Sequence, residues 1–177
     1  MPVNIYLIGF MGSGKSSAGK GIAALLRWNF NDLDKLVEEN EGMTVTGLFA
    51  SKGEEYFRRA ETEALRRVSV RTRSVVACGG GTPCSEENMA VMNSTGLTVY
   101  LRLPVEALVA RLRRSGSQRP LLKDAGPEEL DSRVRNLLAA RSSWYERADL
   151  IIDAESLTEE GMTAMIAAAV RSKGAYL

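Results

Sequence analysis

The feature that most constrains the fold of this chain is a glycine-rich motif close to its N-terminus. Gly9–Ser16 reads GFMGSGKS and matches the pattern G-x-x-x-x-G-K-[ST]. The motif follows a short apolar run, Val3–Ile8, and opens a segment with helical periodicity, Lys15–Leu26. In that setting the glycines let main-chain N–H groups surround an anion, and the helix adds its positive N-terminal end. The motif therefore predicts a binding site for a nucleoside triphosphate, rather than an ordinary glycine-rich turn.

The residue types of the motif divide the work of holding the phosphates. Lys15 is expected to reach the β- and γ-phosphates, and the hydroxyl of Ser16 can ligate Mg²⁺. The residues expected to contact the nucleotide here are Gly12, Ser13, Gly14, Lys15, Ser16 and Ser17.

The rest of the chain alternates between strand-like and helix-like segments. Strands are expected at residues 3–8, 29–32, 74–78, 97–103 and 150–153. Helices are expected at residues 15–26, 36–40, 45–50, 54–68, 86–92, 105–113 and 128–147, and in a final segment capped by Thr158. Because parallel strands need crossover connections, the alternation predicts an α/β fold whose parallel sheet of about five strands is covered by helices on both faces. A chain of 177 residues is expected to form one domain.

Composition excludes several classes of function. Hydrophobic residues make up 45% of the chain and charged residues 25%, which is typical of globular proteins. The 23 basic and 22 acidic residues give a net charge of +1, so no nucleic-acid partner is expected. No apolar run approaches the roughly 20 residues that span a membrane, and the N-terminus carries no export signal. A cytoplasmic protein is therefore expected.

The chain contains no histidine, which limits the chemistry that it can perform. This absence removes Ser-His-Asp triads, histidine general bases and imidazole zinc sites. Cys78 and Cys84 are six residues apart and are expected to be reduced, partly buried thiols rather than a redox or zinc pair. Carboxylates, lysines, arginines, hydroxyls and main-chain amides are left as the functional groups.

Two aspartates stand close to the predicted second strand. Asp32 and Asp34 are two residues apart, which at a strand end places both side chains on one face. In a parallel sheet the carboxyl ends of the strands form the ligand crevice. One carboxylate could hold Mg²⁺ while the other orients or deprotonates an acceptor hydroxyl. A turn-forming or helix-capping aspartate is an equally favoured alternative.

Arg58 and Glu61 are three residues apart and share one face of a predicted helix. A guanidinium facing the crevice suits a carboxylate or phosphate on a small substrate, and Glu61 could fix its orientation. Taken alone, the pair is better explained as a surface ion pair.

A second glycine run, Gly79–Gly81, ends the strand predicted at residues 74–78. Three consecutive glycines cost backbone entropy, which close approach of a ligand to the main chain would explain. A flexible turn is an equally good explanation of this string.

Arginines crowd the start of an irregular segment, residues 115–126, namely Arg111, Arg113, Arg114 and Arg119. The absence of interleaved aromatic residues argues against a nucleic-acid patch, and a lid that places arginine over transferring phosphates fits better. Arg119 is the best candidate because Pro120 restricts it to extended conformations. Arg111 and Arg113 are explained as solubilising charge. Arg141 and Tyr145 follow on the predicted long helix, where Tyr145 is expected to pack in the core.

Taken together, these segments resemble the shikimate kinase family over nearly the whole chain. The matching elements, in order, are GFMGSGKSS at residues 9–17, Asp32-Leu33-Asp34, FRRAE at residues 57–61, GGGT at residues 79–82, RPLL at residues 119–122, and Arg141-x-x-x-Tyr145. The resemblance implies a three-layer α/β/α fold with a five-stranded parallel sheet, similar to nucleoside monophosphate kinases and usually monomeric. It implies transfer of the γ-phosphoryl group of ATP to the 3-hydroxyl of shikimate, on the route to chorismate and aromatic amino acids.

The resemblance also implies roles for individual residues. Lys15 would stabilise the β- and γ-phosphates, Ser16 and Asp32 would hold Mg²⁺, and Asp34 would bind the substrate hydroxyls and act as base. Arg58 and Arg141 would hold the shikimate carboxylate, with Gly79, Gly80 and Gly81 against the substrate. Arg119 would lie over the phosphates from a lid at about residues 113–125, and Arg114 would stack on adenine. Helices at about residues 33–62 would bind the substrate.

Three alternatives remain open on the sequence. A kinase of the same fold could act on another hydroxy acid such as gluconate, although the FRRAE and RPLL elements favour shikimate. A nucleoside monophosphate kinase would not need a hydroxyl-directed Asp34. A nucleotide-binding regulatory module without turnover would tolerate the loss of at least one of Lys15, Asp32, Asp34 and Arg119, all of which are present.

Overall fold

The computed structural model describes residues 4–115, 120–122, 126, 129–155 and 157–172, and its centre is a five-stranded parallel sheet. The strands are β1 (Asn4–Ile8), β2 (Asn29–Asp32), β3 (Ser74–Ala77), β4 (Gly96–Arg102) and β5 (Leu150–Asp153). Their order in the sheet is β2-β3-β1-β4-β5, so the first strand of the chain lies in the middle. All five residues of β1 are buried, as expected for a strand that is covered on both faces.

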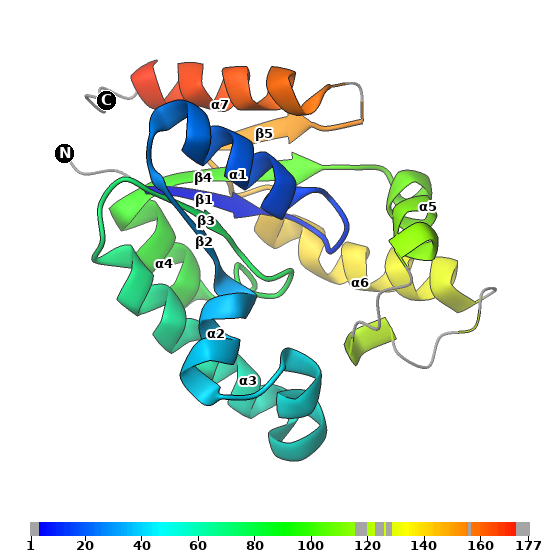
Figure 1. The fold of residues 1–177 in the computed structure, drawn as a ribbon. Helices are drawn as coiled ribbons and strands as arrows, with labels where there is room; N and C mark the ends of the chain where they lie inside the picture. The colour runs from blue at the N-terminus through cyan, green and yellow to red at the C-terminus, as the bar shows by residue number, and fades with distance from the viewer. Residues whose placement is uncertain (1–3, 116–119, 123–125, 127–128, 156, 173–177) are drawn as a thin grey trace.

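Helices cover both faces of the sheet (Figure 1). They are α1 (Lys15–Leu26), α2 (Leu33–Glu41), α3 (Val45–Ser69), α4 (Glu86–Thr95), α5 (Val105–Ser115), α6 (Glu129–Tyr145) and α7 (Glu159–Ser172). The helices α1 and α7 pack against each other on one face, and α3 and α4 pack together on the other. The predicted three-layer α/β/α fold is therefore confirmed.

The strand order brings two loops together at one edge of the sheet. The β1 residue Ile5 lies opposite Val75 of β3 and Leu97 of β4, so the carboxyl ends of β1 and β3 are adjacent. The glycine motif at residues 9–16 follows β1, and the second glycine run follows β3. Two glycine-rich segments that are 70 residues apart in the sequence, at Gly9 and Gly79, are thus neighbours in the fold.

The structure corrects the sequence prediction at the second strand. The strand β2 ends at Asp32 and α2 begins at Leu33, three residues earlier than the predicted helix at 36–40. Asp34 therefore lies in the first turn of a helix, where an acidic side chain also interacts favourably with the helix dipole.

The predicted break between helices at residues 45–50 and 54–68 is confirmed in an altered form. The two segments are joined as α3, but the backbone at Gly53 is not helical (φ 81°, ψ 172°). A left-handed φ favours glycine, which explains why this residue type stands at the kink.

The remaining expectations concern caps, thiols and the irregular segment. Thr158 caps α7, because its Oγ1 accepts a hydrogen bond from the Gly161 amide at 3.1 Å. Cys78 is buried, Cys84 is partly buried, and both are free thiols, as predicted. Of the predicted irregular segment at 115–126, the structure describes Ser115, a 3₁₀ turn at Pro120–Leu122 and Gly126.

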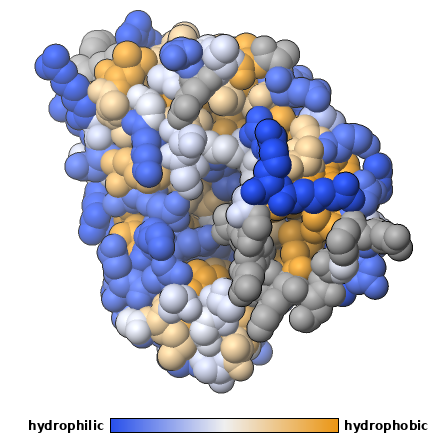
Figure 2. Space-filling model, turned by 45° about the vertical axis from the view of Figure 1, so that its right-hand side comes forward, coloured by the Kyte–Doolittle hydropathy of each residue, from blue (hydrophilic) through white to orange (hydrophobic). Residues whose placement is uncertain are grey.

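The described helices include none with the length and apolar character to cross a bilayer. The face of the molecule drawn in Figure 2 is mostly hydrophilic, with apolar residues in scattered groups. Large hydrophobic side chains that are exposed among the described residues are Leu25, Met43, Val70 and Met165.

Candidate active site

A cavity of about 250 Å³ lies at the carboxyl ends of β1 and β3, and we call it the phosphate cavity. It is lined by Met11, Gly12, Gly14, Lys15, Ser16, Ser17, Asp32, Asp34, Ala77, Cys78, Gly79 and Gly80. The cavity thus contains most of the motif residues that were expected to contact a nucleotide, together with both aspartates.

The loop that forms this cavity has a backbone which only glycine adopts readily. Gly9, Gly12 and Gly14 have φ values of 137°, 81° and 94°. Gly14 immediately precedes α1, so the unpaired N–H groups of the first helical turn point toward the cavity. The loop therefore has the form of an anion cradle at a helix N-terminus.

Lys15 is the principal cation of the phosphate cavity. It is 9% exposed, and its ammonium donates hydrogen bonds to the carbonyl oxygens of Gly9 at 2.9 Å and Phe10 at 2.8 Å. These bonds hold the side chain along the loop with its charge at the cavity wall. The buried Ser13 Oγ makes no hydrogen bond within the described part of the chain, so the loop also retains an unsatisfied polar atom.

Ser16 and Asp32 place two oxygen atoms next to each other in the lining of the phosphate cavity. The Ser16 hydroxyl donates to Asp32 Oδ2 at 2.8 Å. Hydroxyl and carboxylate oxygens suit Mg²⁺, which is usually held by few protein ligands together with phosphate oxygens and water. No group of three or more acidic or cysteine side chains capable of caging a metal occurs in the described ranges. The residues therefore fit a Mg²⁺ ion that arrives with a nucleotide.

A smaller cavity of about 70 Å³ adjoins the phosphate cavity, and we call it the arginine cavity. Its lining residues are Met11, Asp34, Val45, Phe49, Phe57, Arg58, Glu61, Gly79, Gly80, Gly81, Leu121 and Arg141. Met11, Asp34, Gly79 and Gly80 line both cavities. Asp34 is therefore a carboxylate on the wall that the two cavities share.

One side of the arginine cavity is apolar and aromatic. The rings of Phe49 and Phe57 are 4.8 Å apart between centroids, and the guanidinium of Arg58 lies 5.2 Å from the centroid of Phe57. Such a wall suits the carbon skeleton of a small ring compound, while the arginines supply charge at the same end.

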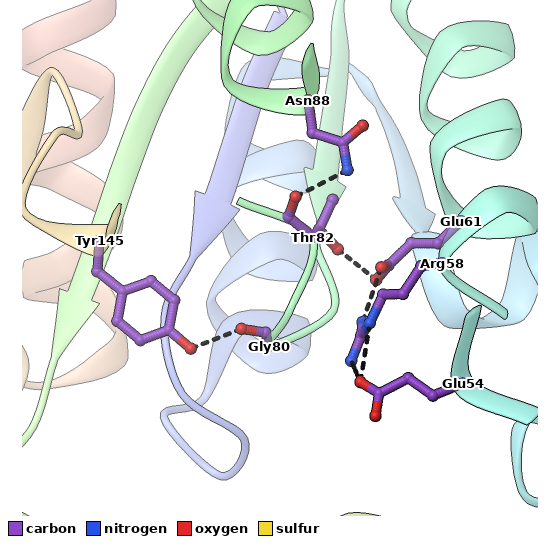
Figure 3. Close-up of polar contacts among 7 residues, drawn as sticks. All are labelled: Glu54, Arg58, Glu61, Gly80, Thr82, Asn88 and Tyr145. Carbon is purple, nitrogen blue, oxygen red and sulfur yellow. Dashed lines mark hydrogen bonds and ion pairs between the residues drawn. The ribbon is translucent and has the colours of Figure 1, made fainter. Parts of the chain in front are cut away.

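Arg58 is held in place by two carboxylates on its own helix (Figure 3). Its Nη1 donates to Glu61 Oε2 at 2.8 Å, and its Nη2 donates to Glu54 Oε1 at 3.0 Å. Glu61 is fully buried, so the pair is not the surface ion pair that the spacing alone would favour. The prediction that Glu61 orients Arg58 is confirmed.

Burial dominates the electrostatics of Glu61. Desolvation raises the pKa of this carboxyl, whereas the charge of Arg58 and a hydrogen bond from Thr82 Oγ1 at 2.5 Å lower it. The nearby Asp34 acts in the same direction as burial, because two like charges disfavour ionisation. Glu61 therefore depends on Arg58 and Thr82 to remain an anion.

The structure gives the second glycine run an explanation that neither sequence-based alternative included. We use the name glycine turn for Gly79–Thr82. A Cβ at Gly81 would lie 2.5 Å from the Arg58 Cζ, and a Cβ at Gly79 would collide with Glu61 Oε1. The glycines thus make room for the two side chains of α3 that line the arginine cavity.

The glycine turn is also anchored, so the alternative of a flexible turn is wrong. Tyr145 Oη donates to the Gly80 carbonyl at 2.6 Å, and Asn88 Nδ2 donates to the Thr82 carbonyl at 2.8 Å (Figure 3). These bonds tie the turn to α6 and α4, while Thr82 Oγ1 ties it to α3.

Arg141 reaches the arginine cavity from α6. Its side chain is 9% exposed, and no ion pair to it occurs among the residues that the structure describes. Its Nη1 lies beside the glycine turn, 3.3 Å from where a Cβ at Gly80 would stand. A buried guanidinium without a carboxylate partner is costly unless a ligand supplies the anion.

The other predicted arginines have different outcomes. Arg114 is exposed, its Nε donates to the Ala110 carbonyl at 3.4 Å, and it lines neither cavity as the described residues define them. Arg119 lies outside the described residues. Arg111 is more than solubilising charge, because its Nη1 lies 3.4 Å from the carbonyl oxygens of Gly12 and Ser13.

Several residues of the site were not found from the sequence. Asn88 and Phe49 belong to no motif, and Thr82 and Tyr145 lie in matching elements without a role having been predicted for their hydroxyls. The Tyr145–Gly80 hydrogen bond joins residues that are 65 positions apart, which only the fold can bring together. In retrospect, Tyr145 had a usable signal, since it follows Arg141 by one helical turn.

Comparisons with known proteins identify relatives of this chain. The family model described as shikimate kinase matches residues 11–171. A shikimate kinase of Geobacter metallireducens is 41% identical over 163 residues, covering 92% of this chain and 89% of the relative. A second, from Caldanaerobacter subterraneus, is 38% identical over 172 residues, covering 97% and 98%.

Solved structures give the same result. The shikimate kinase of Acinetobacter baumannii in complex with shikimate superposes with a TM-score of 0.89 at 33% identity, covering 98% of this chain and 94% of that one. The shikimate kinase of Bacteroides thetaiotaomicron gives 0.87 at 34% identity, with 98% and 99% covered. A deoxyadenosine kinase with a TM-score of 0.60 and 16% identity shares the fold alone.

Proposed function

This chain belongs to the shikimate kinase family, and we propose that its two adjoining cavities transfer the γ-phosphoryl group of ATP to the 3-hydroxyl of shikimate. The observation that carries the proposal is the shared wall. A triphosphate in the phosphate cavity and a hydroxy acid in the arginine cavity would meet at Asp34 and the adjoining glycine turn.

Phosphoryl transfer needs positioning and positive charge more than covalent help, which suits a chain without histidine. Lys15 binds the β- and γ-phosphates and stabilises the charge that spreads over the transferring group. The loop residues Gly12, Ser13, Gly14, Ser16 and Ser17 surround the phosphates with main-chain and hydroxyl donors. Ser16 and Asp32 hold Mg²⁺, whose chemistry is to neutralise charge on the phosphate oxygens.

Asp34 acts on the acceptor. Its carboxylate accepts a hydrogen bond from the 3-hydroxyl, orients it toward the γ-phosphorus and takes its proton as the new bond forms. The position of Asp34 on the wall between the cavities supports this role. Because the acceptor is an alcohol, a base of this kind is useful here, whereas a phosphate acceptor would not need one.

The arginine cavity binds the acid. Arg58 and Arg141 approach the carboxylate of shikimate from α3 and α6, and guanidinium forks match carboxylates in geometry and charge. The residues Gly79, Gly80 and Gly81 lie against the ring, with Phe49 and Phe57 forming the apolar wall.

Arg119 and Arg114 complete the proposal on the nucleotide side. The family resemblance implies that Arg119 would lie over the phosphates from a lid at about residues 113–125, and that Arg114 would stack on adenine. Exclusion of water by such a lid would protect ATP from hydrolysis. The monomeric state and the cytoplasmic location stay predictions.

The test is ADP release with Mg·ATP across a panel of shikimate, quinate, gluconate and nucleoside monophosphates. We expect turnover with shikimate to exceed turnover with every other acceptor by at least about a hundredfold. The reason is that two arginines bind the carboxylate of the acid and one aspartate binds its hydroxyl groups. Preference for gluconate or for a nucleoside monophosphate would overturn the proposal. Formation of shikimate 3-phosphate is confirmed by phosphorus NMR.

A further inference from the structure

The hydroxyl of Tyr145 contacts the glycine turn, which lines the arginine cavity. It donates a hydrogen bond to the Gly80 carbonyl at 2.6 Å (Figure 3). The Nη1 of Arg141 lies 3.3 Å from where a Cβ at Gly80 would stand, so this guanidinium lies beside the same residue. Tyr145 thus fixes the residue of the glycine turn beside which the buried arginine of α6 lies.

The surroundings of Tyr145 hold that hydroxyl in a fixed position. The side chain is fully buried, and its ring packs against Tyr100 with centroids 5.1 Å apart and planes tilted by 35°. Burial raises the pKa of Tyr145, and the charge of Arg141 lowers it without reversing the shift. The phenol therefore remains protonated at physiological pH and keeps its donor.

The two arginines of the cavity differ in what orients them. Arg58 is held by the carboxylates of Glu54 and Glu61. Arg141 has no such ion pair in the described part of the chain, and its guanidinium lies beside Gly80 of the glycine turn. The residue beside Arg141 is in turn held by the hydroxyl of Tyr145.

We propose that Tyr145 is a positioning residue for the acceptor. It fixes the glycine turn and Arg141 relative to each other, so that an acid bound through its carboxylate has its acceptor hydroxyl at Asp34. This inference rests on the proposed function and deepens it. Tyr145 touches no reacting atom, and it acts through the Gly80 carbonyl that it holds and the Arg141 guanidinium that lies beside Gly80. A purely structural tyrosine would support the core through its ring, and its hydroxyl would not matter to the acceptor.

The test compares Tyr145→Phe with the wild-type enzyme, because this change keeps the ring and removes only the hydroxyl. Tyr100→Phe is the matched control, since Tyr100 is the stacked neighbour and lines neither cavity as the described residues define them. Each enzyme is measured with shikimate and with the analogue in which the carboxylate is replaced by a hydroxymethyl group.

We expect Tyr145→Phe to raise the KM for shikimate about three- to tenfold, as suits the loss of one net hydrogen bond that aligns a charged group. The KM for ATP should stay within about twofold. The preference for shikimate over its hydroxymethyl analogue is the ratio of the two kcat/KM values. This ratio should fall by about the same three- to tenfold, which corresponds to the loss of one net hydrogen bond. Tyr100→Phe should leave this ratio unchanged.

The ratio of the two kcat/KM values does not depend on how much of the preparation is folded. An unchanged ratio, or an equal loss with both acceptors, would overturn the inference and leave Tyr145 as a packing residue. A variant that yields no folded enzyme would do the same. Failure of the wild-type enzyme to phosphorylate shikimate would instead overturn the proposed function, so the two failures are distinguishable.

Discussion

The two cavities that meet at Asp34 are built in different ways. The phosphate cavity takes half of its lining from one continuous segment, the loop after β1 and the first turn of α1. The arginine cavity takes its lining from more elements: the loop after β1, α2, both segments of α3, the glycine turn, the 3₁₀ turn and α6. The phosphate cavity depends mainly on the backbone conformation of its loop, which tolerates little change. The arginine cavity depends on side chains that hold one another in position.

This difference predicts how the site responds to change. Substitutions at the shared wall should abolish chemistry, those in the arginine cavity should weaken binding of the acid alone, and those behind the phosphate loop should affect the nucleotide alone. Five variants test this separation.

Asp34→Asn should have the largest effect, because it removes the base at the point where the cavities meet. We expect kcat to fall about 10²- to 10⁴-fold, the usual contribution of a general base. Nucleotide affinity, measured by titration calorimetry, should be retained. The control is Asp131→Asn on the exposed face of α6, where the carboxylate pairs with Arg135. A kcat close to the wild-type value would remove Asp34 from catalysis.

Arg141→Lys and Arg58→Lys separate the two arms of the arginine cavity. Both should raise the KM for shikimate, because lysine cannot make a bidentate contact. We expect the KM for shikimate to rise about 10- to 100-fold in Arg141→Lys and by a smaller factor in Arg58→Lys. The reason is that Glu54 and Glu61 already neutralise the charge of Arg58, whereas no ion pair to Arg141 occurs in the described ranges. A larger rise in KM for Arg58→Lys than for Arg141→Lys would contradict this explanation.

Thr82→Val tests the electrostatics of Glu61. The change removes the hydroxyl that donates at 2.5 Å and lowers the pKa of Glu61, so this pKa should rise further above its ordinary value. Arg58, Asp34 and the Cys78 thiol remain as its charged or titratable neighbours. As the pH falls, Glu61 should be protonated earlier than in the wild-type enzyme, and Arg58 should lose its anchor.

The KM for shikimate in Thr82→Val should therefore be about threefold higher near neutrality and should climb at a higher pH than in the wild-type enzyme. Thr82→Ser keeps a donor and should restore the profile. Parallel KM profiles between about pH 6 and pH 9 for the valine variant and the wild-type enzyme would contradict this view of Glu61.

Arg111→Met should have the smallest effect and act on the nucleotide side alone. The contacts of Arg111 with the carbonyls of Gly12 and Ser13 are long, at 3.4 Å, so we expect the KM for ATP to rise only about two- to threefold. The KM for shikimate should not change. Arg67→Met, which removes an exposed cation paired with Glu63, is the control. An effect on shikimate would mean that the cavities are not separable.

The sequence predicted the phosphate cavity far better than the arginine cavity, for a physical reason. A phosphate loop is formed by residues that are close together in the sequence, since Gly9, Gly14 and Lys15 lie within one segment. Arg58 and Glu61 could be paired from helical spacing for the same reason. The placement of Asp32 and Asp34 in one cavity was right, but the argument from strand alternation was wrong because α2 begins at Leu33.

What could not be predicted depends on how distant segments pack. The glycines of the glycine turn are needed because α3 brings Arg58 and Glu61 against the end of β3. Nothing near residue 80 in the sequence indicates this. The contact between Arg111 and Gly12 likewise spans 99 positions and follows from the return of α5 to the phosphate loop.

The kink at Gly53 separates α3 into two parts that face the same cavity. The part before it carries Val45 and Phe49, and the part after it carries Arg58 and Glu61. No atom lies within 4 Å of where a Cβ at Gly53 would stand, so the residue acts only through its backbone angle. The backbone angle at Gly53 sets how far Val45 and Phe49 lie from Phe57, Arg58 and Glu61 across the cavity. Engineering for bulkier acceptors can therefore begin at a residue that does not line the cavity, by changing the spacing of its lining residues instead of replacing them.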